Sequence, residues 1–121
     1  YQAILEGMAF QFLLGYEQSQ KLGANITRLI CTGGGAKSDV TMQMRADIMD
    51  LEVSTITTDE SGTLGCMILA ATAAGAYGSI EEAIEKAVHI KRTFLPNPAR
   101  RAYYTAKYER FRKLYDLMHL F

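Results

Sequence analysis

The sequence predicts an α/β domain in which helices flank a small parallel sheet. Two short runs rich in β-branched residues, 26–31 and 52–56, surround a helical pattern at 39–49. Because strand, helix and strand follow one another within about thirty residues, we expect parallel strands joined by a right-handed crossover. Further helical patterns before and after this unit are expected to cover the sheet.

The first segment, residues 2–22, has the pattern of a long helix that is apolar over most of its circumference and therefore covered on more than one side. Gly23 is expected to end it in the left-handed conformation. Glu6 has two interpretations: a buried carboxylate with a role in domain closure or, more simply, a first-turn acid that favours the helix start. The predicted packed side chains are Leu5, Met8, Phe12, Leu13 and Tyr16, with Ile4, Phe10 and Leu14 beside them.

A glycine-rich turn separates the first strand from the helix at 39–49. Three residues without a Cβ let the backbone approach a flat ligand more closely than any side chain would allow. The helix start leaves free N–H groups aimed at the same place. The turn therefore predicts a nucleotide site, built from Gly33, Gly34, Gly35, Ala36, Lys37 and Ser38.

Two more helical patterns and an extended segment follow the second strand. Residues 63–77 are mostly small and aliphatic, which predicts close packing against neighbours until the following glycine ends the helix. Ser79 and Glu82 form a capping box that starts a short helix reaching about Val88. Residues 89–96 are predicted to be extended.

The last helix is expected to begin with Asn97 as its cap and Pro98 at the first helical position. Its large apolar side chains recur at spacings of four, three, four and three residues, which places them within about 80° of arc. A stripe this narrow is expected to lie on an apolar surface. It consists of Tyr104, Tyr108, Phe111, Tyr115 and Met118.

The helix at 39–49 has a comparable apolar face, which consists of Val40, Met44, Ile48 and Leu51.

Two strands are too few for a self-sufficient parallel sheet, because such sheets are normally buried on both faces and contain more strands. Missing strands are therefore expected upstream of Tyr1. The helical pattern at 2–22 begins without a capping signal, which independently predicts that the chain starts inside a larger protein. The unpaired sheet edge favours pairing with a second copy of the chain, as a homodimer.

Composition limits the possible partners. The chain has 121 residues, enough for one compact domain, and its 13 basic and 13 acidic residues give a formal net charge of zero. A neutral chain has no long-range field to attract nucleic acid or an anionic membrane. No apolar run approaches the roughly 20 residues that span a bilayer, and no signal-peptide pattern opens the chain. The two cysteines, Cys31 and Cys66, are predicted to be buried free thiols, which favours a reducing, cytoplasmic setting. Neither their spacing nor the isolated His89 and His119 predicts a metal site.

Four blocks of sequence follow one another in a recognisable order. Residues 3–10 are similar to A-x-[LV]-E-G-[IV]-A-F, and residues 33–47 to G-G-G-A-[RK]-S-x(3)-x-Q-x(2)-A-D. Residues 60–65 resemble the start of E-x-x-A-L-G-A-A, and residues 94–115 resemble P-x-P-x(5)-Y-x(3)-Y. Through these blocks, nearly the whole chain resembles the C-terminal part of the FGGY family of carbohydrate kinases, particularly its xylulokinase-like members.

The resemblance implies an actin-like ATPase fold of two ribonuclease-H-like domains with ATP between them, of which residues 1–121 form the C-terminal part of the second. Family members transfer the γ-phosphate of ATP to a sugar hydroxyl, using Mg²⁺ and an aspartate as general base. That aspartate and the phosphate-binding loops precede this part, so the chain alone is expected to be inactive. The resemblance implies the adenosine side of the ATP site, with a pentulose such as xylulose as the sugar, and assigns the nucleotide contacts to Gly33, Gly34, Gly35, Ala36 and Ser38.

Simpler explanations remain open at this site. The Ser38 hydroxyl either bonds the purine edge or caps the helix that starts at Asp39. Lys37 is interpreted as a solvated loop lysine rather than a phosphate ligand, and Asp59 with Glu60 as a solvated acid pair. The alternative function is a non-catalytic actin-like module for assembly or regulation; the upstream sequence separates the two, because a kinase needs the base aspartate and the phosphate loops.

Overall fold

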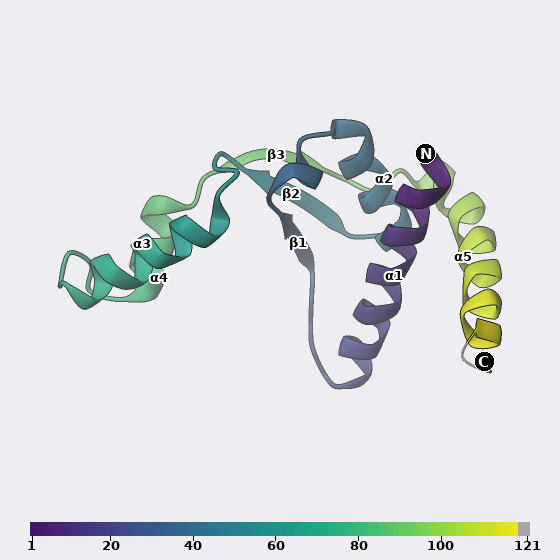
Figure 1. Cartoon of the computed structure of the whole chain (residues 1–121), viewed down its shortest axis with the longest axis horizontal. Coiled ribbons are helices and arrows are strands. Elements are labelled where there is room, and N and C mark those ends of the chain that lie inside the picture. Colours follow the sequence, from purple (N-terminus) through teal and green to yellow (C-terminus); the bar gives the residue numbers. More distant parts are fainter. Residues whose placement is uncertain (119–121) are drawn as a thin grey trace.

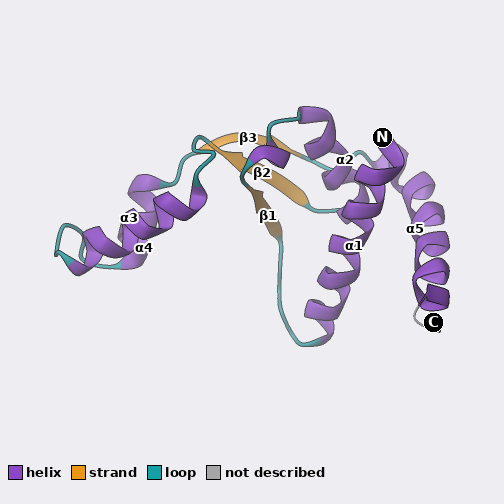
Figure 2. Cartoon of the chain, viewed as in Figure 1, coloured by secondary structure: helices purple, strands orange, loops and turns teal. Residues whose placement is uncertain are grey.

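The structure, a computed structural model, describes residues 1–118 as a layered α/β arrangement (Figures 1 and 2). The sheet lies against one helix, and two further helices lie on the far side of that helix. The elements in order are α1 (Gln2–Lys21), β1 (Arg28–Cys31), the 3₁₀ turn η1 (Gly34–Ala36), α2 (Asp39–Met49), β2 (Glu52–Ile56), α3 (Ser61–Ala73), α4 (Ile80–Ala87), β3 (Ile90–Phe94) and α5 (Pro98–Met118).

The sheet is mixed, so the expectation of a purely parallel sheet is wrong. β1 and β2 are parallel as predicted, with Leu29 opposite Val53, but β3 adds an antiparallel strand on the other side of β2. The segment predicted only to be extended thus forms the third strand. Its side chains are exposed except at Phe94, so it lacks the apolar alternation that marks a strand with one buried face. β1 lies at the opposite edge of the sheet; its pairing with a second copy stays a prediction.

Helix α2 has the predicted bounds and lies at the centre of the molecule. It starts at the Ser38 cap and ends at Asp50, whose φ of 52° is left-handed. One face packs on the sheet, with Met42 and Ala46 fully buried beside Val53. Val40 was predicted to be packed and is 80% exposed.

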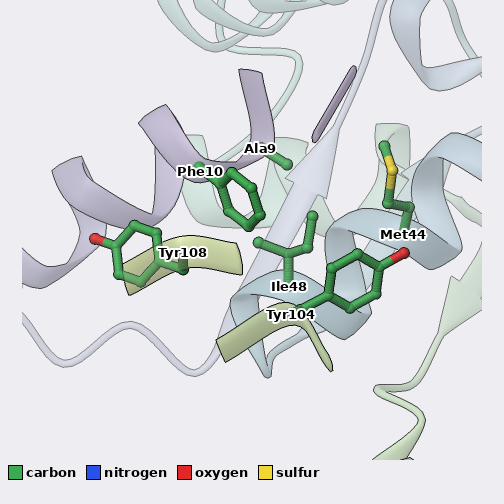
Figure 3. Close-up of a cluster of buried hydrophobic side chains, with 6 residues drawn as sticks. All are labelled: Ala9, Phe10, Met44, Ile48, Tyr104 and Tyr108. Carbon is green, nitrogen blue, oxygen red and sulfur yellow. The ribbon is translucent and has the colours of Figure 1, made fainter. Parts of the chain in front are cut away.

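The opposite face of α2 joins α1 and α5 in the main hydrophobic cluster (Figure 3). The ring of Phe10 contacts two rings of α5, with centroids 5.7 Å from Tyr108 and 5.5 Å from Phe111. The aromatic stripe of α5 is therefore confirmed from Tyr104 to Tyr115, whose ring lies 6.1 Å from that of Phe111, whereas Met118 is 67% exposed. The buried members of the cluster are Ala9, Phe10, Met44, Ile48, Tyr104 and Tyr108.

The predicted packed face of α1 is confirmed in part. Leu5, Phe10 and Leu13 pack in the core as predicted, whereas Ile4, Met8 and Phe12 are exposed. The helix is apolar almost all round, so periodicity alone does not select a side; the positions of α2 and α5 do. Gly23 ends the helix as predicted, with a φ of 89°.

Acidic side chains of α1, of α2 and of its cap pair with basic side chains of α5. The carboxylate of Asp47 has no exposed surface and accepts hydrogen bonds from Gln43 Nε2 and the Asn97 amide, each at 2.8 Å. It also pairs with Arg100 Nη1 at 3.3 Å. These bonds fix the connection between β3 and α5 onto α2. The other pairs are Glu6 with Lys107, Asp50 with Arg101 and Glu17 with Arg112.

Glu6 is a buried carboxylate, so its interpretation as a first-turn surface acid is wrong. It is 5% exposed and accepts hydrogen bonds from Lys107 Nζ at 2.7 Å and from Gln2 Nε2 at 2.8 Å. Burial alone would raise the pKa of Glu6, but the bonds from Lys107 and Gln2 outweigh it and lower the pKa. Glu6 and Lys107 are 101 residues apart and join α1 to α5. No pattern in the sequence indicates this contact.

The contribution of Glu6 to stability is expected to depend on pH. Because its folded pKa lies below the ordinary value of 4.5, this contribution is complete above that value and is lost as the pH falls through the lowered folded pKa. Urea unfolding of the wild type and of Glu6→Gln should show a lower midpoint for the variant at pH 7 and a smaller deficit near pH 3. An equal deficit at both pH values would contradict the assignment.

Helices α3 and α4 pack on each other and project from the sheet away from α1 and α5 (Figure 1). The predicted close packing of α3 is wrong for most of its surface: only Ile68 is buried among its described side chains, and Cys66 is exposed. The helix ends before Gly75, which has a φ of 77°, and not at Gly78. None of the helices formed by residues 1–118 is both long enough and apolar enough to cross a membrane.

The capping box before α4 is confirmed in part. Ser79 Oγ accepts from the Glu82 amide at 3.1 Å, as predicted. The Glu82 carboxylate accepts from the Gly78 amide at 2.7 Å, one residue earlier than the box requires. The start of α5 follows its prediction, since Asn97 Oδ1 accepts from the amide of Ala99 at 3.0 Å.

Candidate functional site: the glycine turn after β1

The predicted site residues form one continuous turn between β1 and α2. Gly33 follows the strand with a φ of 80°, a conformation that glycine adopts without the strain of a Cβ. The chain then tightens into η1, where the amide of Ala36 donates to the Gly33 carbonyl at 3.0 Å. The turn thus brings together Gly33, Gly34, Gly35, Ala36 and Ser38, as the sequence predicts.

Ser38 acts as the cap of α2. Its Oγ accepts a hydrogen bond from the Thr41 amide at 3.3 Å, which satisfies one of the free donors of the helix start. The capping interpretation is therefore confirmed. Because a hydroxyl oxygen has two lone pairs and a proton, this bond leaves the side chain able to bond a ligand as well.

The backbone of the turn is open to solvent. Gly34 and Gly35 are exposed, and Gly33 and Ala36 are half-buried. A Cβ placed on Gly34 would meet no atom within 4 Å, and one placed on Gly35 would meet only Arg45 Nη2, at 3.9 Å. The turn therefore offers bare main chain to a ligand, which is the property that its three glycines predict.

A polar cavity of about 240 Å³ lies beside the turn, at the carboxyl ends of β1 and β2. Lys37 Nζ forms an ion pair with Asp59 Oδ2 at 3.0 Å, and both side chains stay largely exposed, as predicted for this loop. Thr32 Oγ1 and Ser61 Oγ, 2.9 Å apart, join the turn to the start of α3. The lining residues are Cys31, Thr32, Ala36, Lys37, Asp39, Thr55, Ile56, Thr58, Asp59, Lys91 and Arg92.

Several of these lining residues were missed by the sequence analysis. Thr58 and Asp59 follow β2, and the carboxyl ends of two parallel strands meet at one edge of a sheet, so their place near the turn was predictable. Lys91 and Arg92 lie on β3, and their approach could not be predicted without that strand. Arg92 Nη1 pairs there with Asp39 Oδ2.

Metal-binding side chains do not gather in the described part of the chain. Among residues 1–118, no three His, Cys, Asp or Glu side chains form a group that could hold a metal ion. His119 lies outside the described residues. The turn supplies main-chain groups, the Ser38 hydroxyl and the side chain of Lys37, which lines the cavity. These groups are suited to contacting a nucleotide.

Residues 1–74 match the C-terminal domain of the FGGY family of carbohydrate kinases, a stretch that includes the whole glycine turn. The chain belongs to this FGGY family. The L-xylulose/3-keto-L-gulonate kinase of Escherichia coli K12 is 34% identical to it over 113 residues, which is 93% of this chain and 23% of that protein. The xylulose kinase of Lactococcus lactis is 34% identical over 115 residues, again 93% of this chain and 23% of that protein.

Solved structures of FGGY kinases have the same fold. A ligand-bound xylulose kinase from Lactobacillus acidophilus superposes with a TM-score of 0.87 at 26% identity, over 97% of this chain and 24% of that one. A gluconate kinase from the same organism gives 0.86 at 26% identity, over 96% and 23%. The actin-like ATPase fold implied by the sequence blocks is thereby confirmed, and the chain spans about a quarter of the length of these relatives.

Proposed function

We propose that this chain supplies the adenosine side of the ATP site in a kinase that transfers the γ-phosphate of ATP to a sugar hydroxyl. In this proposal it is the C-terminal part of the second domain, and the sugar is a pentulose such as xylulose. The open backbone at Gly34 carries the proposal, because a purine and its ribose need a wall without side chains. Family membership and relatives named as xylulose kinases support it.

The residues of the turn would bind and orient the nucleotide. Gly34 and Gly35 would lie against the purine and ribose, and the Ser38 hydroxyl would bond the purine edge while keeping its cap on α2. Mg²⁺, which would accompany the ATP, neutralises charge that develops on the phosphates. The general base and phosphate loops are expected outside this chain, so its contribution is to hold the triphosphate in line for attack.

Gly34→Val tests the proposal in the full-length protein. We expect the KM for ATP to rise about tenfold, with a smaller change in kcat, because a branched side chain would occupy purine space and remove about 1.4 kcal/mol of binding. A Cβ at this position meets nothing within 4 Å, so the fold leaves open space where the new side chain begins. Initial rates at varied ATP concentration measure the effect.

The matched control is Gly15→Val, at an exposed glycine of α1 that also has open space around its Cβ position. Its KM for ATP should stay at the wild-type value. Unchanged ATP dependence in Gly34→Val would remove Gly34 from the site. Phosphorylation assays with a panel of pentuloses and hexuloses identify the sugar, and no phosphorylation of any panel member with purified full-length protein would favour the assembly module instead.

A further inference from the structure

One arginine links the glycine turn to two other elements. Arg45 lies on α2 and is half-buried. Its Nη1 donates to Cys31 Sγ at 3.6 Å at the end of β1. Its guanidinium carbon lies 5.1 Å from the centroid of the Phe12 ring on α1. The same guanidinium therefore contacts a strand end and a helix that are distant in the sequence.

The Arg45 guanidinium also lies near the glycine turn. A Cβ added to Gly35 would lie 3.9 Å from Arg45 Nη2, whereas one added to Gly33 or Gly34 would have no neighbour within 4 Å. Within residues 1–118, Arg45 forms no ion pair with a carboxylate, unlike four basic residues of α5. A planar cation stacked on an aromatic ring is held in one orientation, and it supports the backbone that lies against it.

We propose that Arg45 is a positioning residue of the nucleotide site, which holds the glycine turn in its binding conformation. This inference rests on the proposed ATP function. A turn with little side-chain support must be ordered when the nucleotide binds, and the entropic cost of that ordering lowers the affinity for the nucleotide. A preformed turn avoids this cost. Arg45 provides this support through its bond to Cys31, at the strand end from which the turn leaves, and it is itself held by the ring of Phe12. It need not touch the reacting phosphates, so its effect falls on ATP binding rather than on the chemical step.

The test compares Arg45→Met, Arg45→Lys and Arg110→Met in the full-length protein. Arg45→Met keeps an unbranched stem close to that of arginine and removes the guanidinium; we expect the KM for ATP to rise about three- to tenfold with kcat within about twofold. Arg45→Lys keeps the charge over Phe12 without the planar fork and should restore part of the affinity. Arg110 is exposed on α5, so Arg110→Met should leave the KM for ATP unchanged.

A purely structural role for Arg45 would give another result. The KM values for sugar and ATP would then rise together, or kcat would fall while the KM for ATP stayed constant, and either outcome would overturn the inference. Phe12→Leu removes the aromatic ring beneath the Arg45 guanidinium. Because Phe12 is exposed, this variant remains informative if Arg45→Met does not fold, and an unchanged KM for ATP in it would also count against the inference.

If Gly34→Val raises the KM for ATP and Arg45→Met does not, only the role of Arg45 fails. If neither variant changes it, the proposed function fails.

Discussion

Replacing Tyr108 by alanine is expected to lower the free energy of unfolding by about 3–5 kcal/mol. The ring is buried, packs against Phe10 and stacks on Phe111 at a centroid distance of 6.3 Å. Its hydroxyl donates to Glu17 Oε2 at 3.0 Å, and burial together with this bond raises the pKa of Tyr108 to about 12. The substitution would leave a cavity where α1 and α5 meet. Urea unfolding followed by far-ultraviolet circular dichroism measures the change.

Tyr108→Phe separates the ring from the hydroxyl. It keeps the packing and removes one hydrogen bond, so a loss of about 1 kcal/mol is expected. Tyr103→Ala, at an exposed neighbouring tyrosine of α5, should also cost far less than Tyr108→Ala. A loss below about 1 kcal/mol in Tyr108→Ala would show that the aromatic stripe is not part of a packed core.

Asp47→Ala is expected to cost about 2–4 kcal/mol, because three donors lose a buried acceptor at once. Two of them, the Asn97 amide and the Arg100 guanidinium, belong to the start of α5, and the third is the side chain of Gln43. The substitution would therefore loosen the junction that sets α5 on α2. The same urea experiment, run beside Tyr108→Ala, gives the magnitude.

Two variants show whether the network or the charge matters. Asp47→Asn keeps one acceptor oxygen and should cost less than the alanine substitution. Asp59→Ala removes a carboxylate whose pair with Lys37 is largely exposed, and it should cost below about 1 kcal/mol. Equal losses in Asp47→Ala and Asp59→Ala would mean that the network around Asp47 contributes no more than a surface ion pair.

The central unit could be predicted from the sequence because its signals are local. The helix Asp39–Met49 and the strand Glu52–Ile56 have the bounds expected from a capping serine, a helical apolar face and a run rich in β-branched residues. The glycine turn follows from the same stretch. Its exposure could also be foreseen, since glycine contributes no side chain to cover the backbone.

The remaining features depend on partners far along the chain. The carboxylate of Glu6 is buried because Lys107 reaches it from α5, and no periodicity within α1 could reveal that. The third strand has four exposed positions, so only its backbone pairing with β2 makes it a strand. Arg45 could not be singled out because an arginine on a helix usually lies in solvent, and its contacts with Cys31 and Phe12 arise only once α1, β1 and α2 pack together.

The cluster in Figure 3 draws its side chains from both ends of the chain, with Phe10 contributed by α1 and Tyr104 and Tyr108 by α5. During translation, at roughly 5–20 residues per second, Phe10 is made several seconds before its partners on α5 are synthesised. Closing so long a loop carries an entropic cost that short-range contacts do not. The nascent chain thus passes through an interval in which α1 is made and the α5 rings that cover Phe10 are still missing, a period when chaperones can bind the exposed side of this helix.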